Sequence, residues 1–164
     1  MKMILLMSAF MITNLTSYSY PIQAVNSLIS KVAKLTKNFK PVQIQKVTLV
    51  AREEKNPPRG QPHTPNRDIG FATVFIRSEN HKEEDSKITI MNIQIVNVSD
   101  SKLQDFKYPQ KEIMLHPLEN SEQAFEIKNK TGYSGNDQVK AVVTYQIDNQ
   151  VSSITSEPVT IYRL

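Results

Sequence analysis

From Pro41 to the end of the chain, apolar and polar residues alternate with a period of two, which is the pattern of strands with one buried face. The segment from Val139 to Asp148 shows this pattern most clearly, because its other face is mostly polar. The apolar residues of this segment are Val139, Ala141, Val143, Tyr145 and Ile147. Asp148 and Asn149 then predict a turn, since both residue types tolerate positive φ.

The same alternation predicts further strands at residues 42–52, 69–77, 87–98, 113–115, 124–128, 151–154 and 159–162. Apolar residues occupy both faces of 69–77, which indicates a central strand covered on both sides. The phase slips between Ile90 and Met91, so we expect a β-bulge or a bend there. Pro158 makes the last segment either an edge strand or a switch between sheets.

Roughly six to eight short strands joined by polar turns are typical of a sandwich or barrel. Nothing helical separates these strands, which disfavours parallel βαβ units. We therefore expect residues 41–164 to form one all-β domain, an antiparallel β-sandwich.

Residues 1–24 have the layout of a secretory signal peptide, with Lys2 before an apolar stretch and a cleavage site after Ala24 or, alternatively, near Ser19. The apolar core has about ten residues, whereas a membrane-spanning helix needs about 20. The alternative is a buried N-terminal helix. A signal peptide predicts an exported protein, either periplasmic or extracellular.

Residues 25–40 change to a helical period, with apolar residues at three- and four-residue steps on one face and lysines around them. Pro41 ends the pattern, because proline cannot continue a helix. We expect an amphipathic helix or a linker here. It could pack on the sandwich, be removed as an extension of the leader, or make peripheral contact with an anionic membrane.

Composition narrows the possibilities further. The 164 residues suffice for one domain, and without cysteine the fold has no disulfide and no thiolate chemistry. The net charge of +4 is small and scattered, which indicates a solvated mixed-charge surface and no nucleic-acid partner.

Four late blocks carry a resemblance to a known architecture: 115–120 (LHPLEN), 125–127 (FEI), 141–145 (AVVTY) and 156–161 (SEPVTI). They run from a turn through a short hydrophobic strand to a closing hairpin. In this the chain resembles immunoglobulin-like and fibronectin-III-like modules over roughly residues 42–164. It lacks the core tryptophan and the cysteine pair of antibody domains. The resemblance implies an Ig-like sandwich and favours binding or scaffolding over catalysis.

Two loops hold candidate binding residues. The proline-rich connection 53–68 carries Arg59, His63 and Arg67, and its paired arginines could bind a carboxylate or sulfate; otherwise it is a solvated loop. The connection 99–112 carries Phe106 and Tyr108, which could contact a sugar or a protein. The alternative is that Leu103 and Phe106 fold over the open end of the sandwich.

No nucleotide, metal or nucleophile motif is present, and the three histidines lie far apart in the sequence. The carboxylates and His81 within 77–86 match no metal-binding spacing, so we expect a charged hairpin tip, with no metal and no cofactor. The sequence therefore favours a non-catalytic exported domain that binds a protein or a polysaccharide. The alternatives are a periplasmic or secreted hydrolase or metal-dependent enzyme, and an edge-strand assembly subunit.

Overall fold

A computed structural model describes residues 27, 31, 40–57, 60, 65–135 and 138–164. The chain divides into two units, Met1–Phe39 and Lys40–Leu164, of which the second holds all the described strands. The predicted signal peptide at 1–24 lies outside the described residues, as does most of the segment 25–40. Only Ser27, Lys31 and Lys40 of that segment are described, the first two as helical residues.

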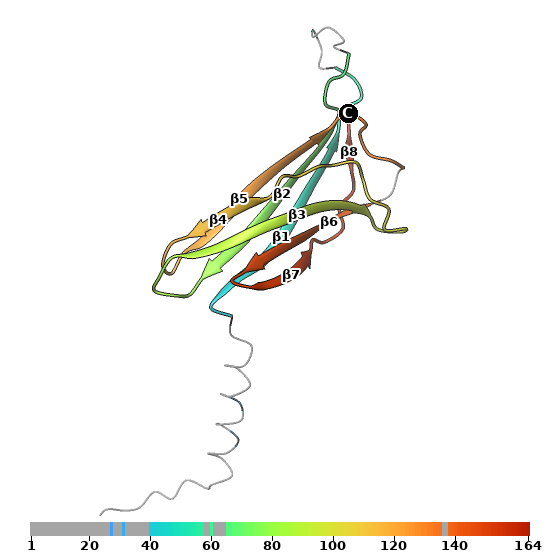
Figure 1. The fold of residues 1–164 in the computed structure, drawn as a ribbon. Coiled ribbons are helices and arrows are strands. Elements are labelled where there is room, and N and C mark those ends of the chain that lie inside the picture. Colours follow the sequence, from blue (N-terminus) through green and yellow to red (C-terminus); the bar gives the residue numbers. More distant parts are fainter. Residues whose placement is uncertain (1–26, 28–30, 32–39, 58–59, 61–64, 136–137) are drawn as a thin grey trace, which may run out of the picture. The chain divides into compact units, whose positions relative to one another are not determined.

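The unit Lys40–Leu164 is an all-β sandwich of two four-stranded sheets, as the sequence predicts (Figure 1). The first sheet has the order β5-β2-β1-β8 and the second the order β4-β3-β6-β7. Every neighbouring pair is antiparallel except β1 and β8. The strands are β1 (Val42–Glu53), β2 (Gly70–Asn80), β3 (Ser86–Asn97), β4 (Lys111–Leu115), β5 (Asn120–Asn129), β6 (Val139–Ile147), β7 (Gln150–Thr155) and β8 (Tyr162–Arg163).

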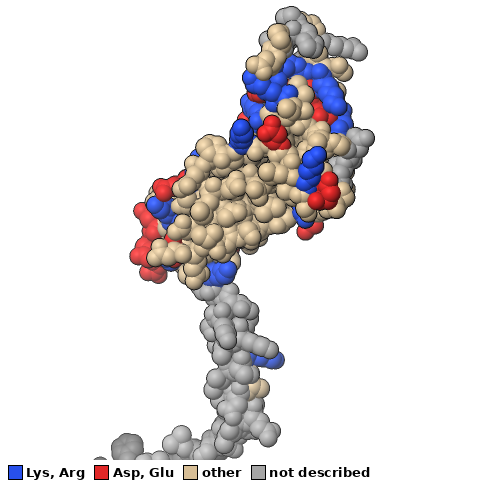
Figure 2. All heavy atoms as spheres, turned by 45° about the vertical axis from the view of Figure 1, so that its right-hand side comes forward, with Lys and Arg blue, Asp and Glu red and all other residues tan. Residues whose placement is uncertain are grey.

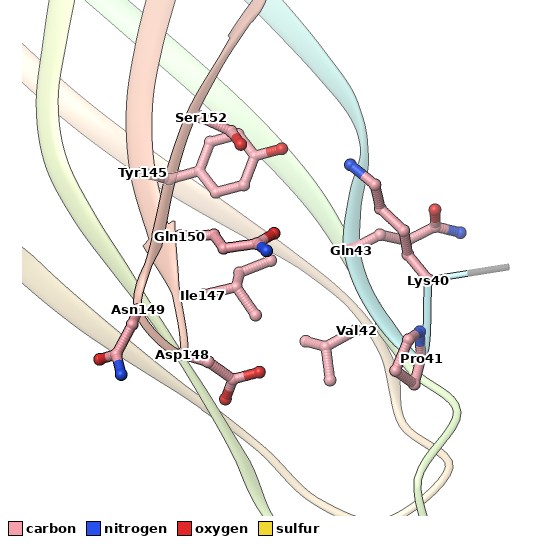
Figure 3. A pocket seen from close by; sticks show the side chains of 10 residues that line it. All are labelled: Lys40, Pro41, Val42, Gln43, Tyr145, Ile147, Asp148, Asn149, Gln150 and Ser152. Atoms are coloured by element: carbon pink, nitrogen blue, oxygen red, sulfur yellow. The ribbon is translucent and has the colours of Figure 1, made fainter. Parts of the chain in front are cut away.

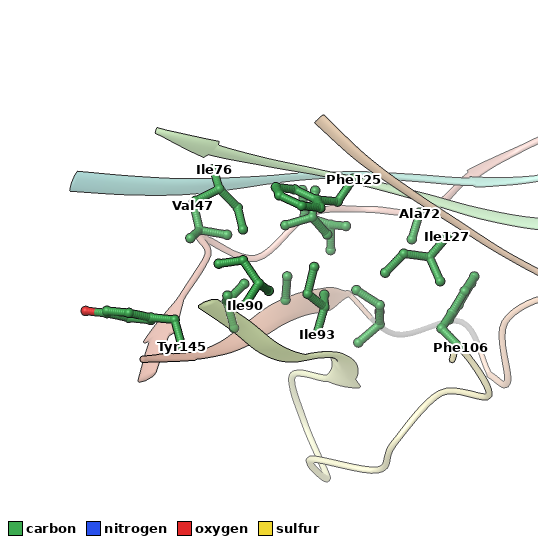
Figure 4. Packing of buried hydrophobic residues seen from close by; sticks show 14 of the residues in the cluster. Val47, Ala72, Ile76, Ile90, Ile93, Phe106, Phe125, Ile127 and Tyr145 are labelled. Atoms are coloured by element: carbon green, nitrogen blue, oxygen red, sulfur yellow. The ribbon is translucent and has the colours of Figure 1, made fainter. Parts of the chain in front are cut away.

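The core lies between the two sheets and takes alternate residues from each long strand (Figure 4). On β6 the predicted inward face is confirmed, with Val139, Ala141, Val143 and Tyr145 buried and Ile147 partly buried against them. Each buried valine side chain contributes about 1.5–3 kcal/mol of transfer free energy when it leaves water. The turn after β6 is also confirmed, since Asp148 adopts a φ of 52°.

Two β-bulges shape the sheets. The predicted bulge in β3 is present, because the register with β6 shifts between Ile90 and Asn92 and leaves Met91 as the extra residue. A second bulge, which the sequence pattern did not reveal, shifts the register of β1 with β2 between Ile44 and Lys46. In both strands the bulge restores the inward direction of the apolar residues that follow it.

The prediction that residues 69–77 are covered on both sides is wrong for the outer side. Ala72, Val74 and Ile76 are buried between the sheets, whereas Phe71 and Phe75 lie half-buried on the outer face of the first sheet. No second layer covers them among the described residues. Instead the Arg52 guanidinium lies 4.9 Å from the centre of the Phe71 ring, which shields part of its face.

The C-terminal segment crosses from one sheet to the other, as one alternative for the proline-marked segment predicts. Val159 exchanges backbone hydrogen bonds with Val139 of the second sheet, at 2.8 and 2.9 Å. Tyr162 and Arg163 then pair with the end of β1 in the first sheet. The backbone of this segment is therefore already paired on one side, with β6 at Val159 and with β1 at Tyr162 and Arg163.

Candidate docking surface

The outer face of the second sheet carries few charged residues on β3, β6 and β7, while Glu112 of the edge strand β4 pairs there with Lys87 at 2.9 Å. We define the uncharged face as the outward side chains of β3, β6 and β7 other than two lysines: Thr89, Met91, Asn92, Gln94, Val96, Val142, Thr144, Gln146, Val151, Ser153 and Thr155. Lys87 and Lys140 are the charged outward residues of these three strands. The side chains form short cross-strand rows, of which Asn92, Thr144 and Ser153 make one.

The outer face of the first sheet differs, because charged residues occupy most of its cross-strand rows. Its outward positions include Lys46, Arg52, Arg77, Glu79, Glu122, Glu126 and Lys128. A sandwich that is solvated on both sides would carry charge on both outer faces. In the view of Figure 2, charged side chains gather toward the two ends of the molecule and an uncharged surface lies between them.

Exposed apolar groups accompany the uncharged face. Met91 is 38% exposed and Val151 is 57% exposed, and Met114 on the outer side of β4 is 55% exposed. None of the residues that define the face is aromatic. Methionine is enriched at protein interfaces, whereas this face offers no aromatic ring on which a sugar could stack. The composition of the face thus fits a protein partner better than a sugar polymer.

A groove of about 350 Å³ lies between the start of β1 and the β6–β7 hairpin (Figure 3). Val42, Tyr145 and Ile147 supply its apolar wall. Polar side chains surround this wall, among them Lys40, Gln43, Asp148, Asn149, Gln150 and Ser152. The groove adjoins the free side of β7, so the hairpin belongs both to the groove and to the uncharged face.

Three of the five residues that the sequence singled out belong to the described part of the chain. Arg59 and His63 lie outside the described residues. Arg67 donates from Nη2 to the carbonyl oxygen of Glu54 at 2.6 Å, so its guanidinium links the two ends of the connection 53–68. No described contact brings Arg67 near the two aromatic candidates.

Of the two interpretations of the loop 99–112, the position of Phe106 fits the one in which it folds over the end of the sandwich, and not the exposed contact. Phe106 is 7% exposed and packs its ring 4.9 Å from that of Tyr133, at the end of the core. Leu103, expected to fold down with it, is instead 54% exposed. Tyr108 is partly buried with its ring edge-on to Phe125 at 5.7 Å, and burial raises the pKa of its phenol. The loop 99–112 therefore contributes mainly to packing.

At the hairpin end, two histidines lie beside carboxylates. His81 Nε2 lies 3.3 Å from Glu79 Oε2, and His116 Nδ1 lies 3.1 Å from Asp85 Oδ1. In the described part of the chain, no three histidine, aspartate or glutamate side chains are placed to hold a metal ion. The buried Asn80 organises this end, since its amide donates to the carbonyls of Glu84 and His116 at 2.8 and 2.9 Å.

Sequence reasoning missed a buried carboxylate at the opposite end. Glu53 is 1% exposed; its Oε1 accepts the backbone N–H of Tyr133 and its Oε2 the Nη1 of Arg163, both at 2.9 Å. The Tyr133 hydroxyl donates to the carbonyl of Phe71 at 2.8 Å. Burial, and secondarily the negative charge of Glu53, raise the pKa of Tyr133 well above its ordinary value. This cluster ties β1, β8 and the β5–β6 loop together.

Compared with models of known protein families and with curated proteins, the chain matches none. Within the described ranges, no helix combines the length and the apolar composition that a membrane crossing requires. The structure therefore defines the class as an all-β sandwich, and the function has to be inferred from its surfaces.

Proposed function

We propose that this chain is an exported, non-catalytic, Ig-like β-sandwich that binds a protein partner through the uncharged face. The observation that supports the proposal is the difference between the two outer faces: most cross-strand rows of the first sheet hold charged residues, whereas two lysines are the charged outward residues of β3, β6 and β7 in the second. Desolvating a charged side chain is costly, so the centres of protein interfaces are poor in charged residues.

Export rests on the layout of residues 1–24. It places the domain in the periplasm or outside the cell, where the partner would be another envelope or extracellular protein. Cell fractionation followed by N-terminal sequencing of the isolated protein tests this part. We expect a mature N-terminus near residue 25, and an intact Met1 in the cytoplasmic fraction would contradict it.

The binding proposal is tested by affinity capture from envelope extract with matched variants. Thr144→Glu with Gln94→Glu puts two carboxylates on the uncharged face, whereas Thr48→Glu with Gln45→Glu makes the same exchanges on the first sheet. We expect the first pair to reduce the recovered partner at least about tenfold, because buried unpaired carboxylates cost more than about 1.4 kcal/mol.

The control pair should leave the recovered amount unchanged. Both variants have their substitutions at solvent-facing positions, so both should retain the far-ultraviolet spectrum of the parent. Equal recovery by the two variants would contradict the assignment of the uncharged face. Loss in the control alone would transfer the binding site to the first sheet.

A further inference from the structure

β7 differs from every other described strand because it contains no charged residue. Edge strands present unpaired backbone groups and are usually protected by charged side chains. The other edges of the two sheets follow this rule, since β4 carries Lys111 and Glu112, β5 carries Glu122, Glu126 and Lys128, and β8 carries Arg163. β7 is thus an edge strand without that protection.

The free backbone groups of β7 can be identified from its register with β6. Ile147 and Gln150 flank the two-residue turn and are paired directly with each other, and the Ser156 N–H donates to the Ala141 carbonyl oxygen at 2.9 Å. The backbone N–H and C=O groups of the even-numbered residues of β7 therefore point toward β6. The N–H and C=O groups of Val151, Ser153 and Thr155 consequently point away from β6. None of the described residues forms a hydrogen bond with these groups.

We infer that β7 pairs antiparallel with β7 of a second copy of this chain, across a twofold axis at Ser153. Pairing in this register places Ser153 opposite Ser153 of the second copy and Val151 opposite its Thr155. The outward groups of the three residues then satisfy one another, and the two second sheets join into one. This inference uses the backbone of β7 and stands apart from the proposed function of the uncharged face.

A second copy fits this edge better than an unrelated strand, because twofold pairing requires a strand that has no charged residue at its centre. An isologous contact sets each residue against itself or a nearby counterpart, so a charged residue at its centre would meet its own charge. β7 avoids this conflict with Val151, Ser153 and Thr155, whose side chains also make favourable β-branched and hydroxyl cross-strand pairs. Joining the sheets would also make the uncharged face continuous across both copies.

The charged residues on either side of β7 predict how the dimer depends on salt concentration. Asp148 precedes the strand and Glu157 follows it, so antiparallel pairing brings Asp148 of one copy toward Glu157 of the other. Added salt screens this repulsion, because the Debye length falls from about 10 Å at 0.1 M to about 3 Å at 1 M. The dimer should therefore tighten as the salt concentration rises, whereas an ion-paired dimer would weaken.

The test is sedimentation of the full chain over a range of concentrations, with Ser153→Lys, Ser153→Glu and an equimolar mixture of the two. Each variant alone sets like charges opposite each other at the axis, and we expect its dimer dissociation constant to rise about tenfold. The mixture sets lysine against glutamate, so it should recover the affinity of the parent. Thr48→Lys, on the first sheet, serves as the matched control and should not change it.

Three results would overturn the inference. One is a parent chain that stays monomeric up to millimolar concentration. Another is a dimer that Ser153→Lys leaves unchanged, and the third is a mixture that remains as weak as its two components. Ser153 is exposed, so the variants should fold, and Val151→Lys provides a second substitution on the same edge if one of them does not.

Discussion

The buried carboxylate of Glu53 allows the sharpest stability prediction. Glu53→Gln keeps the size of the side chain but replaces one acceptor oxygen with an amide NH₂ group. Either the Tyr133 N–H or the Arg163 guanidinium then loses its acceptor, and leaving a buried donor unsatisfied costs about 1–3 kcal/mol. The other bond loses its charge assistance, worth about 1 kcal/mol more.

Two effects reduce that sum. The Arg163 side chain is 32% exposed, so water replaces part of what it loses. A neutral amide also avoids the desolvation cost of a buried carboxylate. We therefore expect Glu53→Gln to lower the free energy of unfolding by about 2 kcal/mol, which for a domain of this size lowers Tm by about 6–10 °C.

Urea denaturation followed by circular dichroism measures this difference directly. Glu54→Gln is the matched control, because that neighbouring carboxylate pairs with Arg52 at 3.2 Å on the surface. A surface pair of this kind contributes less than about 1 kcal/mol. If Glu53→Gln proved as stable as the parent to within about 0.5 kcal/mol, the proposed role of this cluster in holding β8 against β1 would be refuted.

Three further changes have defined outcomes. Ile93→Ala, at a position 1% exposed, should cost about 2–5 kcal/mol in urea denaturation, whereas Met91→Ala at the exposed bulge should cost less than about 1 kcal/mol; equal costs would contradict the bulge register. Asn80→Ala removes the amide that binds two loop carbonyls and should cost about 2 kcal/mol, measured in the same way; an unchanged midpoint would contradict this. The raised pKa of Tyr133 means that the folded state retains its phenolic proton when the unfolded chain releases it. The free energy of unfolding should therefore fall as pH rises above about 10, and Tyr133→Phe should reduce this slope; a slope equal to that of the parent would contradict it.

Strand positions could be predicted from the sequence because alternation is a local property. Residues 47–51 and 139–147 each place most of their apolar side chains at alternate positions, and the structure buries these positions in both strands. The bulge at Met91 was visible for the same reason, as a slip of phase within one strand. The Ig-like resemblance and the export of the chain stay predictions, since the described residues test neither.

The direction of loop side chains and the pairing of distant strands are not local properties, so for Phe106 the sequence left both an exposed and a buried position open. Phe106 sits in a polar loop, and its burial depends on the Tyr133 ring, which only the folded chain brings beside it. Glu53 reads as the first residue of a loop, yet Arg163 meets it from the far end of the chain. The uncharged face arises because β3, β6 and β7 lie side by side, and no single strand reveals that arrangement.

Methionine oxidation tests the central proposal most directly. Beyond the first 24 residues the chain has two methionines, Met91 and Met114, and both are exposed on the outer side of the second sheet. The chain would be treated with dilute peroxide alone and in complex with the partner captured from envelope extract, and oxidation of both sulfur atoms would be followed by mass spectrometry. We expect the partner to slow oxidation of both methionines severalfold. In a parallel reaction with an amine-reactive label, the labelling of Lys128 on the first sheet should be unchanged. Equal oxidation with and without the partner, together with protection of Lys128, would contradict the proposed docking surface.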